Sequence, residues 1–256
     1  MPSAVVVPFS SQHLAAIFGH DIFTSQNFRS PYQFWIPLIS MYSGLRPLEV
    51  AQLHIEDIKL GGAIWYIDVN DTPPRDLKSQ YSSRYVPVHS TLIDLGFLYF
   101  IDDLKKADEK VLFPELWRGS VLNASVGIKW FQHTLDDVRV VGSGLCSSSF
   151  RSTVANVYTQ AGYNPDIIGA LFGFLPTSTV HPTTFPLSVL RDAIEILNAS
   201  SLGFDATSVV KPWTAGCIER AKMLRKIQKA APGIDLSDED LTSAVMSMPK
   251  LKKRRI

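Results

Sequence analysis

The sequence predicts an α+β fold that is mainly α-helical and contains a small antiparallel sheet. Two stretches, residues 63–69 and 83–89, are rich in β-branched and aromatic residues, and a polar linker containing prolines separates them. From residue 90 onward, apolar residues recur at three- and four-residue spacing, which is typical of amphipathic helices. These patterns predict a small sheet set into a larger body of helices.

The residues before the sheet are predicted to form three helices. A helix within residues 10–20 begins at a serine cap and ends near a glycine. A second helix, over 30–44, also begins after a serine and ends at a glycine. Pro37 lies inside the second helix and predicts a kink or a missing N–H donor. A third helix, over 47–54, begins with a proline and carries Glu49 near its positive end.

The remaining elements follow the change in periodicity. Residues 63–69 and 83–89 are expected to pair as antiparallel strands, with a third short strand around residues 76–79. Helices are expected over residues 90–106, 125–140, 147–162, 164–174, 186–197 and 215–231. The chain is predicted to divide into a main domain over 1–200 and a helical extension over 201–256.

The composition excludes several classes of protein. With 46% hydrophobic and 19% charged residues, a chain of 256 residues has enough apolar side chains for a sizeable core. No apolar run reaches the roughly 18 residues that a membrane span needs, and the N-terminus does not resemble a secretion signal. The two cysteines form neither a disulfide framework nor a metal cluster. We therefore expect a cytoplasmic protein without a membrane partner, a metal or another cofactor.

The formal net charge of +1 is low for a nucleic-acid-binding protein. Binding to nucleic acid would therefore depend on local clusters of basic residues. Arg46, Lys78 and Arg151 each lie at the boundary of a predicted element. Together they would form a strong phosphate site, because guanidinium groups bind phosphate oxygens at two points. Alternatively, Arg46 caps helix carbonyls or pairs with Glu49 one turn later.

Three segments carry a resemblance to a known family. They are Gly-Leu-Arg-x-x-Glu-Val-x-x-Leu-x-x-x-Asp-Ile at 44–58, a turn lysine before Ser-x-x-Val-Pro-Val-His, and Ser-Phe-Arg-Ser-Thr at 149–153. In this order they resemble the catalytic domain of tyrosine recombinases, the phage integrase family. The resemblance covers roughly residues 8 to 198. It implies the tyrosine-recombinase catalytic-domain fold and a role in DNA recombination and integration, in a mobile genetic element.

The family cuts one DNA strand with a tyrosine nucleophile, which forms a 3′-phosphotyrosyl link and needs no cofactor. Two arginines, which Arg46 and Arg151 match, hold the scissile phosphate, and a lysine, which Lys78 matches, is the general acid. Arg84 matches a strand position that is commonly basic. Two histidines are also expected, but this chain has Ser148 and Phe174 at their positions.

The nucleophile is also missing at its expected place. The stretch LPTSTVHPTTF contains no tyrosine, and His181 lies nearest to the expected position. The resemblance therefore implies a recombinase fold without recombinase chemistry, a DNA-binding pseudoenzyme in which Ser148, Phe174 and His181 are the degenerate positions. The residues expected to bind DNA are Arg46, Lys78, Arg84, Arg151, Lys252, Lys253, Arg254 and Arg255.

Three functional hypotheses follow. The first is an accessory or regulatory factor that binds duplex DNA as a homo-oligomer or beside an active recombinase. The second is an active site-specific recombinase whose tyrosine was replaced or comes from elsewhere. The third is a protein-interaction module that does not bind DNA. The family's N-terminal DNA-clamping domain is not recognisable here, because the resemblance begins within about ten residues of the start.

Overall fold

The computed structural model describes residues 5–79, 82–174, 185–214, 216–219 and 222. The first helices are α1 (Ser11–Phe18), α2 (Asp21–Thr24), α3 (Pro31–Ser43) and α4 (Pro47–Ala51), followed by the 3-10 helix η1 (Ile55–Asp57). The sheet strands are β1 (Ile58–Gly61), β2 (Ile64–Val69) and β3 (Arg84–Pro87). Next come α5 (Ser90–Asp94), α6 (Phe97–Lys106), η3 (Pro114–Leu116), β4 (Trp117–Arg118) and β5 (Val121–Leu122). The later helices are α7 (Ala124–Asp137), α8 (Ser149–Gln160), α9 (Pro165–Phe172), α10 (Leu187–Ile194), α11 (Ala199–Leu202) and η5 (Ala206–Ser208).

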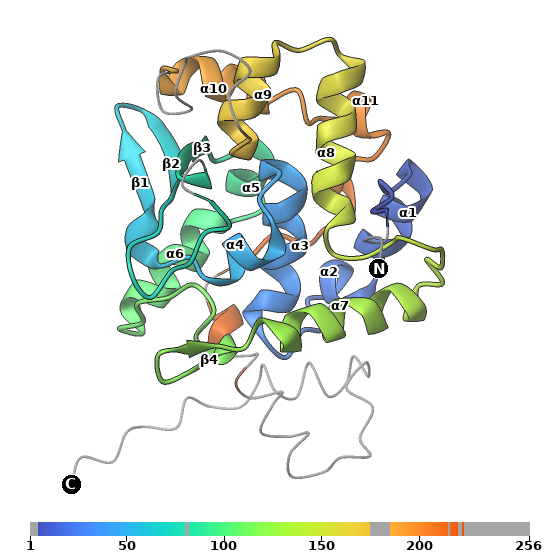
Figure 1. Cartoon of the computed structure of the whole chain (residues 1–256). Helices are drawn as coiled ribbons and strands as arrows, with labels where there is room; N and C mark the ends of the chain where they lie inside the picture. The colour runs from blue at the N-terminus through green and yellow to red at the C-terminus, as the bar shows by residue number, and fades with distance from the viewer. Residues whose placement is uncertain (1–4, 80–81, 175–184, 215, 220–221, 223–256) are drawn as a thin grey trace, which may run out of the picture.

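The predicted fold class is confirmed. Helix α3 runs through the middle of the molecule and packs against α4, α5, α7 and α8 (Figure 1). The antiparallel sheet lies to one side, in the order β1-β2-β3, with α9 and α10 against β3. Apart from Arg46 in the loop before α4, the site described below is built from these packed elements. None of the described helices is long and apolar enough to cross a membrane.

The start and end signals of α3 act as the sequence predicts. Its N-cap is Ser30, and Gly44 ends it in the left-handed conformation at φ 66°. A Cβ at Gly44 would lie 3.0 Å from the ring of Phe172, so glycine permits both the backbone turn and this close approach. Pro37 lies within the helix, which is continuous over thirteen residues.

Two expectations about individual elements are wrong. The third strand is β1 and not residues 76–79, where the structure has no strand. A two-residue turn at 62–63 joins β1 to β2, and Ile58 pairs with Ile67. The single helix expected over 90–106 is divided into α5 and α6, because Gly96 adopts φ 88° between them. A Cβ at Gly96 would lie 2.5 Å from the backbone oxygen of Trp213.

The beginning of the predicted extension packs onto the main body. Trp213, in the first part of this extension, is 1% exposed. Its indole contacts the rings of Phe28, Phe34, Trp35 and Phe100. The domain boundary at residue 200 stays a prediction, and the helix expected over 215–231 lies mostly outside the described residues.

Candidate functional site

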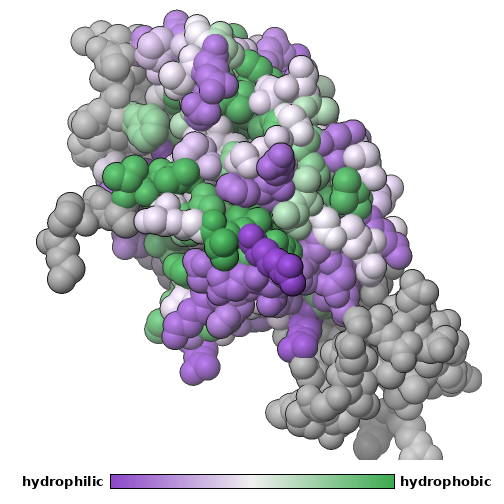
Figure 2. Space-filling view, turned by 90° about the vertical axis from the view of Figure 1, so that its right-hand side faces the viewer, coloured by the Kyte–Doolittle hydropathy of each residue, from purple (hydrophilic) through white to green (hydrophobic). Residues whose placement is uncertain are grey.

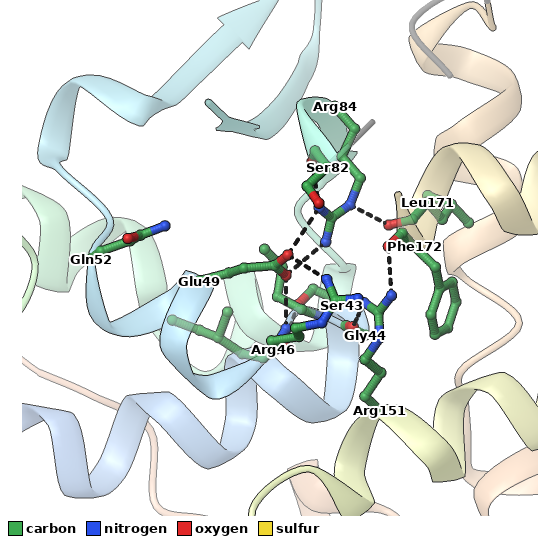
Figure 3. Close-up of polar contacts among 12 residues, drawn as sticks. Ser43, Gly44, Arg46, Glu49, Gln52, Ser82, Arg84, Arg151, Leu171 and Phe172 are labelled. Carbon is green, nitrogen blue, oxygen red and sulfur yellow. Dashed lines mark hydrogen bonds and ion pairs between the residues drawn. The ribbon is translucent and has the colours of Figure 1, made fainter. Parts of the chain in front are cut away.

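Two arginines share the carboxylate of Glu49 at the start of α4. Arg46 is the N-cap residue, and both its backbone N–H and its Nη1 donate to Glu49, each at 2.8 Å. Arg84, on β3, donates from Nη2 to Oε2 of the same carboxylate at 2.8 Å and from Nη1 to Oε1 at 3.3 Å. Pairing of Arg46 with Glu49, one of the two interpretations of the sequence, is therefore present (Figure 3).

The local sequence explains this geometry. Gly44 turns the chain out of α3, and Pro47 begins α4, so Arg46 is held in an extended conformation between two helices. The spacing of three residues then brings Glu49 back to the Arg46 N–H in a capping box.

Arg84 is completely buried, with none of its side chain exposed. Besides Glu49, it donates to the carbonyls of Ser82 at 2.6 Å and Leu171 at 2.8 Å. It thus ties β3 to the end of α9 and to the start of α4. In this position its guanidinium orients Glu49 and does not face solvent. A direct contact of Arg84 with DNA stays a prediction, and the burial of the side chain argues against it.

Arg151 reaches the same cluster from the first turn of α8. It is 9% exposed and donates to the carbonyls of Gly44 and Phe172. Among the described residues, no carboxylate forms an ion pair with Arg151. Figure 3 shows its guanidinium between Gly44 and Phe172, on the opposite side of the cluster from the Arg84 side chain.

The charges of the cluster are out of balance. Arg46, Arg84 and Arg151 carry three positive charges against the one negative charge of Glu49, which leaves +2. Burial would raise the pKa of Glu49, but the charge and hydrogen bonds of Arg84, with those of Arg46, lower it to about 2. Burial, and then the charges of Arg46 and Arg84, lower the pKa of Arg151 to about 9. The cluster is therefore chemically suited to bind an anion.

Of the other predicted site residues that the structure describes, Phe174 contacts this cluster. Lys78 is exposed on the loop between β2 and β3, and none of the polar contacts of the described residues joins it to the arginines. Ser148 is exposed at the N-cap position of α8, and its side chain makes no capping bond. Phe174 follows α9, and its ring lies 4.9 Å from the Arg151 guanidinium carbon. His181 and the basic residues 252–255 lie outside the described residues.

The loop that carries Lys78 is held by residues that the sequence analysis missed. Arg75 donates to both carboxylate oxygens of Asp57, at 2.8 and 2.9 Å. The side-chain amide of Gln52 exchanges two hydrogen bonds with the backbone of Asp76. No motif marked these partners, because they lie 18 and 24 residues apart in the chain.

The two tyrosines nearest to Arg151 in sequence, Tyr158 and Tyr163, pack against one another. Tyr158 is 1% exposed and donates its hydroxyl proton to the Ala193 carbonyl at 3.0 Å. Burial raises the pKa of this phenol. Tyr163 packs edge-on against Tyr158, as expected for packing residues.

Among the described residues, no group of three or more His, Cys, Asp or Glu side chains could hold a metal ion. An apolar groove lies between α3, α4, α7 and the start of α8. The exposed side chains of Leu48 and Ile128 belong to its lining.

Comparison with known structures identifies one similar fold. The integrase from mycobacterium phage Brujita superposes with a TM-score of 0.52 at 18% identity, over 77% of this chain and 60% of that one. The chain thus matches about three fifths of the length of that integrase, and the likeness shows that the two share a fold. No protein-family model matches the sequence, and no curated protein matches it.

Proposed function

We propose that this chain is a member of the phage integrase family that binds duplex DNA without cutting it. The observation that carries the proposal is Arg151, a cation that is 9% exposed and has no carboxylate partner among the described residues. A buried charge is costly unless a counter-charge accompanies it. A DNA phosphate at this position would supply the missing negative charge.

Arg46 is the more accessible contact of the same site. Its side chain is 28% exposed, and Glu49 occupies only part of its guanidinium fork. A phosphate could therefore be held between the exposed face of Arg46 and the edge of Arg151, while Glu49 and Arg84 keep Arg46 in place. Lys78 and the basic residues 252–255 would add contacts to the DNA backbone, which position a protein without reading sequence.

The lack of cutting is proposed from the residues that are absent. The family positions for two histidines hold Ser148 and Phe174, and neither side chain is an acid or a base. Losing one general acid or base typically costs a factor of about 10² to 10⁴ in rate. Without a tyrosine at the expected place, the covalent route is lost as well. The chain would then be an accessory or regulatory factor, acting in the cytoplasm as a homo-oligomer or with an active recombinase.

One observation favours the alternative of a protein-interaction module. The groove between α4 and α7 is lined almost entirely by apolar groups, among them Tyr32, Trp130 and Phe131. Figure 2 shows hydrophobic side chains at the surface among hydrophilic ones on one face of the molecule. Exposed apolar patches of this kind often mark contacts with proteins.

The first experiment measures binding to sheared DNA from the source genome across a series of salt concentrations, with the recovered fragments sequenced. We expect affinity to fall steeply with salt, because each phosphate contact releases counterions. The variant Arg46→Gln should lower both the affinity and the salt dependence. Arg191→Gln is the matched control, because Arg191 is 48% exposed on α10 and pairs with the adjacent Asp192.

The same complexes are then treated with SDS. Complexes that dissociate support binding without cleavage, whereas protein that stays attached to DNA would show a covalent link and direct the search to His181 first. If the wild-type chain binds no DNA even at low salt, the DNA-binding proposal fails and the protein-interaction module is favoured.

A further inference from the structure

Phe174 is held in a fixed position beside the arginine cluster. Helix α9 ends at Gly173, which adopts the left-handed conformation at φ 63°. The N–H groups of Gly173 and Phe174 both donate to the Gly169 carbonyl, at 2.8 and 3.1 Å. This C-cap fixes the backbone from which the Phe174 side chain projects.

The two phenylalanines at the end of α9 have different environments. The ring of Phe172 is completely buried, whereas Phe174 is 43% exposed. The two rings stack at a centroid distance of 5.5 Å and an interplanar angle of 23°. The guanidinium carbon of Arg151 lies 4.7 Å from the Phe172 centroid and 4.9 Å from that of Phe174. The buried Phe172 ring thus packs against the Phe174 ring, which stays accessible to solvent beside the Arg151 guanidinium.

An accessible aromatic ring beside arginines is the arrangement with which proteins bind unpaired nucleotides. The arginines attract the phosphate, and the ring stacks on the base, whatever its identity. In an intact duplex each base is already stacked between its neighbours and is not available to Phe174. The ring is therefore useful only for a nucleotide whose base has left the stack.

We propose that Phe174 is a stacking platform for an unpaired nucleobase whose phosphate is held by Arg46 and Arg151. The ligand class is then DNA with unpaired nucleotides, such as a single strand, a gap or a flap. This inference rests on the proposed function, because it uses the same arginines for the phosphate. The inference goes further in one respect: the site should bind a strand with unpaired bases more tightly than an abasic strand that carries the same phosphates.

The opposite role for Phe174 would be to shield Arg151 from phosphate. Arg151 is already covered by the carbonyls of Gly44 and Phe172 and by the Phe172 ring. These contacts leave only an edge of Arg151 exposed, and a ring that covered this edge would not need to be 43% exposed itself. The two roles predict opposite effects when Phe174 is replaced: loss of affinity for a platform and gain of affinity for a shield.

The experiment compares three fluorescent probes of roughly 12 nucleotides, a length within the usual range of binding sites for single strands. They are oligothymidylate, an abasic strand with the same number of phosphates, and a duplex. Binding to the full chain is measured by anisotropy for the wild type, Phe174→Leu and Phe174→Tyr. Tyr99→Leu is the matched control, because Tyr99 is 68% exposed on α6.

We expect the wild type to bind oligothymidylate roughly 5- to 140-fold more tightly than the abasic strand, the range given by stacking of one base. Phe174→Leu should lose this preference and retain its affinity for the abasic strand, whereas Phe174→Tyr and Tyr99→Leu should keep the preference. The inference is overturned if Phe174→Leu keeps the preference or binds more tightly. If the wild type binds the duplex and the abasic strand but shows no preference for bases, only the platform fails. If it binds none of the probes, the proposed function fails as well.

Discussion

Two buried arginines of this protein have opposite electrostatic environments. Arg75, in the loop between β2 and β3, is 6% exposed and binds the carboxylates of Asp57 and Glu56. Arg151, on α8, is 9% exposed, and its hydrogen-bond partners among the described residues are the carbonyl oxygens of Gly44 and Phe172. Burial lowers the pKa of both groups, but the hydrogen bonds to Glu56 and Asp57 outweigh it at Arg75, where the net shift is upward.

The difference separates a structural arginine from a candidate binding arginine. The charge of Arg75 is neutralised within the chain, so its pairing holds a loop in place. At Arg151, the nearest carboxylate in the cluster, that of Glu49, is already engaged by Arg46 and Arg84. A positive charge without a partner favours binding an anion from outside, and buried charges of this kind are concentrated at functional sites.

The largest expected effect comes from removing the carboxylate of the cluster. Glu49→Gln removes the carboxylate that Arg46 and Arg84 share. All three arginines of the cluster, and not Arg151 alone, would then lack a carboxylate partner. Breaking a buried ion pair on one side costs about 3 to 5 kcal/mol, and we expect the upper end of this range. Urea unfolding measures the loss. Glu56→Gln is the control, because the Glu56 side chain is 72% exposed and should contribute less than about 1 kcal/mol.

The pH dependence of unfolding tests the same carboxylate. The pKa of Glu49 is about 2 in the folded chain and lies below the ordinary value of 4.5. Its contribution to stability is therefore fully present above pH 4.5 and is lost as the pH falls towards 2. In Glu49→Gln, the decline in stability across this window should be shallower than in the wild type. An identical decline in both proteins would contradict the role assigned to Glu49.

A paired substitution tests the comparison of the two arginines directly. Arg75→Met leaves Asp57, which is 2% exposed, without its main partner. Asp57 retains hydrogen bonds from the His54 N–H and the Asn70 amide. We therefore expect the free energy of unfolding to fall by about 3 kcal/mol. Arg151→Met loses bonds to two carbonyls but also removes a desolvated charge, so the cost should stay below about 2 kcal/mol. DNA binding should show the reverse order, with a large loss only in Arg151→Met. Equal losses of stability and of binding in the two variants would remove the distinction.

The parts of the fold that could be predicted from sequence are those with local signals. Ser30 and Gly44 bound α3 as expected, and the β-rich stretches pair as β2 and β3. The division between α5 and α6 was missed because the helical periodicity continues across Gly96. Its cause is the backbone of Trp213, which approaches from more than a hundred residues away.

In the candidate site, too, local contacts could be predicted from the sequence and long-range contacts could not. Arg46 and Glu49 are three residues apart, so their pairing was open to prediction. The meeting of Arg84 with Glu49 and of Arg151 with Gly44 depends on how β3 and α8 pack against α3 and α4, and no local pattern encodes it. The family resemblance predicted that Arg46 and Arg151 hold one phosphate, with Lys78 beside them, and matched Arg84 to a basic strand position. Arg46, Arg84 and Arg151 do lie in one cluster, but their roles stay predictions, and the burial of Arg84 was not predicted.

The smallest expected effect concerns Lys78, which is exposed on a loop held in place by Arg75 and Gln52. If the loop presents Lys78 to one DNA phosphate, Lys78→Ala should weaken binding only several-fold but reduce the slope of log affinity against log salt by about 1. The thermal midpoint should not change, because no described contact depends on this side chain. Lys106→Ala is the control, since Lys106 is 67% exposed and pairs with Asp102 on α6. An unchanged slope in Lys78→Ala would remove this lysine from the DNA interface and leave the arginine cluster as the part of the described surface that binds phosphate.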